Sequence, residues 1–313
     1  KRREGSYRPA LAEVMQDRLT AHDLDVNRQM FNAKTGALAK VTTDSGTTQV
    51  LEDPYNVDQA GTGTKFIFPG DQLMFYSGAT PRTRVKVTSV DHSASSMVVT
   101  PDPQTTAADL VYKATDDTDN RNGEANGLLG SVSDSDDDFE NIDTGVATRW
   151  SSYVLDNSGV SRPPSDSLVM QMIEVLRARS RQTPNLIVTS PGIVLKYSEI
   201  FLPLRRLDGQ DVQLRGGYKP IAGIIHAGGV IPVISDADCP QRHMFFLNTS
   251  AFRMADVVGT EWAELDGATF DRVDDKDAIS GYIRKYWNLI TIKRNANGLL
   301  KDLDDISAIE RQH

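Results

Sequence analysis

The stretch Asp166–Gln182, DSLVMQMIEVLRARSRQ, followed by Asn185–Thr189, NLIVT, decides the fold of this 313-residue chain. Apolar residues recur along the first segment at alternating steps of one and three, which places them in one stripe of an α-helix. The stripe consists of Leu168, Val169, Met172, Ile173 and Leu176. A helix with one apolar stripe must bury that stripe against another element, so the stretch predicts a packed unit.

Signals at both ends set the limits of this helix. Ser165 or Asp166 can cap its start, and arginines near its end suit the negative end of the helix dipole. Thr183-Pro184 stops it, because proline cannot continue a helix. The β-branched run that follows predicts a buried strand, and Ile193–Phe201 predicts a second, short helix.

Downstream of this unit the chain alternates between strand and turn patterns. A hairpin is predicted around Asp208-Gly209, and strands are predicted at Met244–Leu247 and Ala251–Met254. The segment Ile279–Arg294 mixes aromatic and β-branched residues and is predicted to end in a core strand. This order has no regular strand-helix-strand repeat, so it predicts an α+β fold and not a doubly wound nucleotide-binding fold.

Upstream, three stretches differ in character. Pro9–Leu19 has proline at a helix start and one apolar stripe, which predicts an amphipathic helix in an N-terminal arm. Residues 27–64 show poor hydrophobic periodicity and are predicted to be extended or loop-rich. Residues 65–114 contain short β-prone runs at roughly ten-residue spacing, which predicts an inserted antiparallel barrel or sandwich.

The charge of the chain is concentrated in one segment. The whole sequence has 34 basic and 43 acidic residues, a net charge of −9. Residues 115–143 hold ten acidic side chains and one base, Arg121, so they account for all of it. Self-repulsion predicts that this segment is a mobile, exposed loop. The one dense basic cluster, Lys1 to Arg3 with Arg8, is interpreted as a solvated tail, which argues against a nucleic-acid reader with a basic stripe.

Composition limits the class of protein further. With 39% apolar and 25% charged residues, the chain has the composition of an ordinary soluble globular protein. The single cysteine, Cys239, excludes an internal disulfide. The most apolar stretch, Pro220–Ile234, has about 15 residues against the roughly 20 that a membrane span needs, so no span is expected.

No sequence motif predicts a chemical site. Cys239 and His243 form only half of a zinc-type pairing, and the acidic run at residues 134–139 places phenylalanine where a calcium loop must turn. Gly61-Thr62-Gly63 lacks the third glycine of a dinucleotide loop, and Asp91-His92-Ser93 fits turn chemistry better than a catalytic relay. The sequence therefore predicts no catalytic residue, no bound cofactor and no metal site. Loose surface binding of a divalent cation stays open as an alternative.

From Trp150 onward the chain resembles the major capsid proteins of tailed bacteriophages that are built on the Hong Kong 97 type shell fold. The resemblance rests on the order of parts: an arm, a β-rich region, the long helix with its following strand, and then three further segments. These are HAGGVIPVISDADCP at 226–240, MFFLNTSAFRMADVVGTEWAELDGATFDRV at 244–273 and GYIRKYWNLITIKRNANGLLKDL at 281–303. It covers residues 145–305 well and residues 1–145 in arrangement only.

The resemblance implies a division of the chain into five parts. They are an N-terminal arm at 1–27; an extended-loop region at 28–130 with an inserted β-module at about 65–114; a peripheral domain at 131–203 with its spine helix at 166–182; an axial domain at 204–271; and a return to the peripheral domain at 272–313. The inserted module departs from the minimal family pattern.

The same resemblance implies the function. The chain would be a major capsid protein, not an enzyme, that self-assembles into the icosahedral head of a tailed phage around double-stranded DNA. Its partners would be copies of itself in hexamers and pentamers, with scaffolding, portal and decoration proteins as further candidates, DNA by non-specific proximity, and no membrane. Its location would be the virion, after assembly in the host cytoplasm. Two alternatives stay open: another phage structural component, such as a tail or decoration protein, and an enzyme whose site the sequence does not display.

Overall fold

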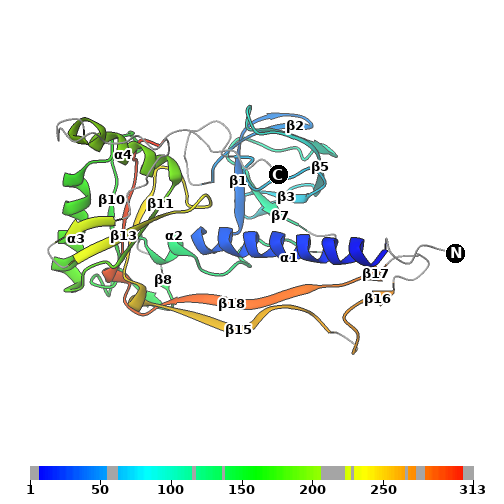
Figure 1. Ribbon diagram of the computed structural model, residues 1–313. Helices are drawn as coiled ribbons and strands as arrows, with labels where there is room; N and C mark the ends of the chain where they lie inside the picture. Colours follow the sequence, from blue (N-terminus) through cyan, green and yellow to red (C-terminus); the bar gives the residue numbers. More distant parts are fainter. Residues whose placement is uncertain are drawn as a thin grey trace.

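The structure, a computed structural model, describes residues 7–54, 63–114, 118–135, 138–205, 223–226, 229–264, 267–272 and 279–305. These residues form an arm helix, a barrel, a body built on a six-stranded sheet, and a two-stranded ribbon (Figure 1). The predicted α+β class is confirmed. The predicted hairpin around Asp208-Gly209 and the basic residues Lys1 to Arg3 lie outside the described residues.

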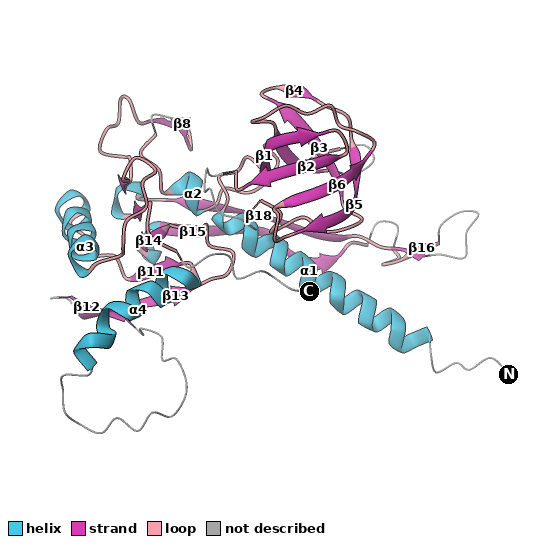
Figure 2. Cartoon of the chain, turned by 90° about the horizontal axis from the view of Figure 1, so that it is seen from above, coloured by secondary structure: helices cyan, strands magenta, loops and turns pink. Residues whose placement is uncertain are grey.

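The arm helix α1, Tyr7–Phe31, is longer than the predicted Pro9–Leu19. Its last turns are buried, with Val26 and Phe31 in contact with the rest of the chain, whereas Val14 near its start is exposed. The extra length comes from this buried end, where tertiary packing stabilises residues whose own pattern is too polar to predict a helix. The start of α1 points away from the body (Figure 2).

The barrel is a closed ring of strands. Its order is β3-β5-β6-β2-β1-β7, and a further pairing of β7 with β3 closes it. The strands are β1 (Ala37–Ser45), β2 (Thr48–Glu52), β3 (Gln72–Ser77), β5 (Val85–Asp91), β6 (Ser96–Thr100) and β7 (Leu110–Lys113), with the short β4 (Thr80–Pro81) against β3. Alternate residues point inward and form one core, including Val41, Leu73, Phe75, Val87, Val99 and Val111.

The sequence predicts an extended or loop-rich stretch at residues 27–64; β1 and β2 are extended, but they form regular paired strands that this expectation does not include. The pairing of these two strands shifts register between Val41 and Thr43, which marks a β-bulge. A bulge breaks the two-residue alternation on which a sequence prediction of a strand depends. The barrel therefore draws its strands from Ala37–Lys113.

The body sheet has the order β10-β19-β14-β11-β13-β12. Its strands are β10 (Tyr153–Leu155), β19 (Gly298–Leu300), β14 (Met244–Leu247), β11 (Leu186–Thr189), β13 (Gly229–Ser235) and β12 (Gly223–His226). Strand β11 runs parallel to β13 and antiparallel to β14, so the sheet is mixed. The predicted strands at 185–189 and 244–247 are confirmed as β11 and β14.

Helices cover both faces of this sheet. Helix α3, Asp166–Ser180, buries the predicted stripe against one face, in a cluster that includes Met172, Leu176 and Phe246. On the other face, Phe31 of α1 and Val132, which follows the short α2 (Leu128–Ser131), pack with Phe245. The predicted cap is confirmed: the Ser165 hydroxyl accepts a hydrogen bond from the Leu168 amide at the start of α3.

The remaining helical elements are short or follow β11 directly. The second predicted helix is present as α4, Pro191–Arg205. Two 3-10 turns, Thr249–Ala251 and Arg294–Ala296, flank the ribbon where it leaves the body. Among the described helices, none combines the length and the hydropathy that crossing a membrane requires.

The ribbon consists of β15, Phe252–Trp262, and β18, Ile283–Thr291, which pair with each other and with no other described strand. It runs alongside α1 and away from the body (Figure 1). The expected core strand at the end of 279–294 is wrong, because β18 is half exposed and lies outside both sheets. Small pairs, β16 (Asp271–Arg272) with β17 (Ile279–Ser280) and β8 (Asp138–Phe139) with β9 (Ile142–Asp143), complete the described strands.

Candidate interaction surface

The ribbon exposes several apolar side chains, two of them on one face of β18. Tyr286 and Ile290 alternate along β18 and therefore project from the same face, with exposed fractions of 59% and 41%. The register of β15 shifts on either side of Val258, and Val257, in the first of these bulges, is 81% exposed. Single exposed apolar residues are common on protein surfaces, but a group on one face marks an interaction site.

One ion pair crosses this face of the ribbon. Arg284 donates two hydrogen bonds to Oε1 of Glu261, at 2.9 and 2.7 Å, from the opposite strand. Both side chains are exposed, so the pair adds little to the stability of the chain. This face therefore mixes apolar and polar side chains: Arg253 lies opposite Ile290, Asn288 lies between Tyr286 and Ile290, and the Glu261–Arg284 pair lies farther along the ribbon.

A second apolar group lies on the edge of the body sheet. Ile225 of β12 pairs with Val230 of β13, and both are more than half exposed. Their neighbours along the strands, Ile224 and Ile231, point to the other face and are buried under α3. Among the described strands β12 is the last one of the sheet, so an edge with no partner in the described part of the chain and two exposed apolar side chains lie at the same place.

The arm helix supplies a third surface, because it is only partly packed. A groove of about 440 Å³ separates it from the barrel and is lined by Leu24, Phe66 and Phe68, among others. A second groove of about 340 Å³ separates it from the ribbon and is lined by Trp262 and Ile283, among others. Helix α1 therefore stands between two open grooves along its middle turns.

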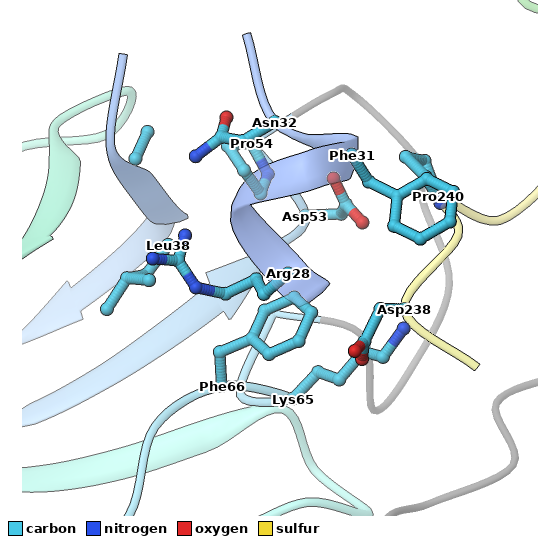
Figure 3. A pocket seen from close by; sticks show the side chains of 11 residues that line it. Arg28, Phe31, Asn32, Leu38, Asp53, Pro54, Lys65, Phe66, Asp238 and Pro240 are labelled. Carbon is cyan, nitrogen blue, oxygen red and sulfur yellow. The ribbon is translucent and has the colours of Figure 1, made fainter. Parts of the chain in front are cut away.

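At its base, α1 is held by buried charges from the acidic segment. Glu124, with a side chain 3% exposed, accepts two hydrogen bonds from the Arg28 guanidinium at 2.5 and 3.1 Å. Figure 3 shows Arg28 of α1, Asn32 just after the helix, and Phe66 around a small cavity, which has a volume of about 20 Å³. That volume holds about one water molecule.

The prediction of an exposed, mobile acidic loop is wrong for part of the segment. Glu124 is buried, and Asp119 accepts a hydrogen bond from the Tyr76 hydroxyl of β3 at 2.7 Å. The physical reason is that both carboxylates find partners far away in the sequence, which a local count of charges does not show. Asp116 and Asp117 lie outside the described residues.

The residues considered for chemistry have structural surroundings. Cys239 is buried, and its thiol donates to the carbonyl oxygen of His243; burial raises the pKa of the thiol well above its usual value. Asp91 accepts hydrogen bonds from the amide and hydroxyl of Ser93, which confirms a turn there. Within the described part of the chain, no group of three histidine, cysteine or acidic side chains is placed to bind a metal ion.

Comparison with known proteins gives two structural similarities. No protein-family model matches the sequence, and no curated protein matches it. The chain is similar to one in the Cyanophage A-1(L) capsid asymmetric unit, with 17% identity and a TM-score of 0.40 over 56% of this chain and 57% of that one. It is also similar to one in the holo-SrpI encapsulin complex from Synechococcus elongatus, with 14% identity and a TM-score of 0.33 over 60% of each chain. Both matches span less than two thirds of the solved chain.

Proposed function

We propose that this chain is a shell-forming structural protein, the major capsid protein of a tailed bacteriophage. The observation that carries the proposal is the presence of separate uncovered surfaces on elements that project from the body. The arm helix and the ribbon both extend away from the body sheet (Figure 2), and the ribbon exposes Tyr286 and Ile290 on one face. Elements of this kind reach neighbouring copies, whereas a protein that works alone buries its apolar surface.

The placement of these surfaces favours repeated head-to-tail contact. The ribbon and the β12–β13 edge differ in shape and lie on different parts of the molecule. A contact between unlike surfaces is heterologous, and heterologous contacts close into rings when the rotation between copies allows it. Several modest interfaces on each copy then add, because buried apolar area contributes about 25 cal/mol per Å² and every further contact is intramolecular.

The remaining expectations belong to this proposal. Helix α3 would be the spine helix of a peripheral domain, and residues 204–271 would form an axial domain around the centres of hexamers and pentamers. Double-stranded DNA would lie inside the shell. The net charge of −9 suits a lining that does not hold the DNA backbone tightly, since phosphate contacts require basic side chains. The location would be the virion, with assembly in the host cytoplasm together with scaffolding, portal and decoration proteins.

Negative-stain microscopy of the expressed chain tests the proposal. We expect closed shells from the native protein, and no shells from the double variant Tyr286→Ser with Ile290→Ser. Because both side chains are exposed in the single chain, the variant should unfold at the native temperature. Val160→Ser, at an exposed apolar residue away from the ribbon, is the matched control and should still form shells.

Two results would overturn the proposal. Rings or tubes would indicate a tail component, and a monomer that binds preformed heads would indicate a decoration protein. Shells that form equally well from the ribbon variant would keep the shell-forming function and would show that the ribbon face is not an assembly surface.

A further inference from the structure

Charged side chains of alternating sign cross the base of the arm helix. Lys113 on β7 lies 4.0 Å from Asp25 of α1, and Asp25 lies 3.1 Å from Nε of Arg28 on the next turn. The other side of the Arg28 guanidinium contacts Glu124, in the segment between the barrel and the body, at 2.5 Å. The chain of charges therefore connects the barrel, the arm helix and the segment that leads into the body.

Glu124 accepts four hydrogen bonds at this site, from three different side chains. Besides Arg28, the side-chain amides of Asn32 and Asn120 donate to its carboxylate at 2.7 and 2.6 Å. Asn32 follows α1 and Asn120 lies on the same segment as Glu124, so the carboxylate joins two separate parts of the backbone. Hydrogen bonds to a buried charge are about twice as strong as those between neutral groups.

Ionisation at this site is favoured by the partners. Burial alone would lower the pKa of Arg28, but the charges of Asp25 and Glu124 raise it above its usual value. Burial alone would raise the pKa of Asp25, but Arg28 and Lys113 hold it below its usual value. Asp25 and Arg28 are therefore charged at neutral pH, and salt screens a buried charge such as Arg28 only weakly.

The backbone segments that meet at the base of α1 are in direct contact, with no space for a side chain between them. A Cβ atom on Gly36, just before β1, would lie 2.4 Å from the carbonyl oxygen of Asn120. A Cβ atom on Gly127 would lie 2.4 Å from the carbonyl oxygens of Gln29 and Asn32. These approaches leave no room for a side chain, so the end of the helix, the entry to the barrel and the 118–127 segment are fitted directly to one another.

The rest of the arm helix is held far less. The two grooves beside α1 are open at Arg18 and Ala21, and Val14 beyond them is 55% exposed. From Arg28 to Tyr7 the helix extends about 32 Å at 1.5 Å per residue, so a rotation of about 10° at the base moves its start by about 5 Å. A small change in the angle of α1 at its base therefore displaces the start of the helix by several Å.

We propose that Glu124 is the positioning residue of the arm helix, which fixes the angle at which α1 leaves the body by holding Arg28 and Asn32. The angle is a property of the single chain. Its consequence for assembly rests on the proposed function, since a projecting helix meets its neighbour at the angle that its base sets.

Distances between two spin labels in the dilute full-length chain test this assignment. Labels are attached at Asp17→Cys on α1 and Ala178→Cys on α3, both exposed positions. The native Cys239 stays unlabelled, because it is buried and burial raises the pKa of its thiol. We expect a single narrow distance in the native background, and a distance shifted or broadened by several Å in Glu124→Gln, whose amide places hydrogens against the donors of Arg28 and Asn32.

Two further variants make the result decisive. Glu199→Gln removes an exposed carboxylate that pairs with Lys196 on α4 and should leave the distance unchanged. The double variant Arg28→Met with Glu124→Met removes the two buried charges together, and the partly exposed Asp25 keeps Lys113 as a partner, so the variant should fold even if Glu124→Gln does not. A native distance in a folded chain that lacks the Glu124 charge would overturn the proposal. Because the measurement precedes assembly, a chain that forms no shells still gives the answer.

Discussion

At the scale of single residues, the buried His243 makes the stability of the fold depend on pH. Its ring is buried beside Phe245, and Nδ1 donates to the carbonyl oxygen of Gln241 at 2.5 Å. Burial lowers the pKa of His243 to about 4, because the protonated ring would lose its hydration. The ring is therefore neutral in the folded chain at any pH near 7.

This histidine should make the protein less stable in mild acid. Between pH about 6.5, where an unfolded histidine titrates, and pH 4, the unfolded chain binds the extra proton, so stability is intact above that range and falls within it. The loss reaches up to about 3 kcal/mol. Urea unfolding at several pH values should show a shallower decline in His243→Gln than in the native chain. Asp25 acts only below about pH 4, since its pKa is lowered in the folded state.

Gly127 gives a second prediction at this scale. Gly127→Ala places a Cβ atom against backbone carbonyl oxygens that cannot move independently, and it should lower the free energy of unfolding by about 2 to 4 kcal/mol. Gly259→Ala on β15 is the matched control, because a Cβ there meets nothing within 4 Å. Thermal unfolding measures both. Equal midpoints for the two variants would contradict the close packing at the base of α1.

At the scale of elements, the start of α3 depends on one hydroxyl. Ser165 is extended, and its side chain accepts from the amide of Leu168, an amide that has no partner within the helix. Ser165→Ala should therefore lower the free energy of unfolding by about 1 kcal/mol. Ser165→Asp keeps an acceptor and adds a negative charge at the helix start, so urea unfolding should show near-native stability. Equal stability of Ser165→Ala and Ser165→Asp would contradict a stabilising role for the cap.

The sequence predicts α3 better than the barrel strands, because the residues that define α3 are neighbours in the sequence and those that define the strands are not. The stripe and cap of α3 fall within one stretch, and the predicted 166–182 agrees with Asp166–Ser180. Strand β1 pairs with β7, so Ala37 meets Tyr112, and no local pattern carries that information. Glu124 is a sharper case: its partner Arg28 lies 96 residues away, and a count of charges places it in solvent.

The apolar residues on both faces of β18 are the reason why the sequence predicts a core strand there. They are Trp287 and Leu289 on one face and Tyr286 and Ile290 on the other. That pattern is typical of a strand covered on both sides. In the single chain only one face is partly covered. The second apolar face is the one for which the proposed function supplies a neighbouring copy.

At the scale of the whole molecule, the barrel and the body have separate cores. The barrel core contains residues from β1 to β7, and the two body clusters contain none of these strands. The chain enters and leaves the barrel at one place. Ala37 pairs with Tyr112, and the Asn122 amide donates to the carbonyl oxygen of Thr35 at 2.9 Å. A unit with its own core and adjacent ends has the form of an insertion.

Separate cores predict separate unfolding. Calorimetry of the native chain should show two transitions, and Val99→Ala should lower only that of the barrel while Leu176→Ala lowers only that of the body, each by the cost of a cavity in its own core. Replacing residues 37–113 with a short glycine-serine linker should leave the body transition alone, because adjacent strand ends are only about 5 Å apart. A single transition shifted by both point variants, or a body that no longer unfolds cooperatively without the barrel, would mean that the contacts at the base of α1 merge the two cores into one folding unit.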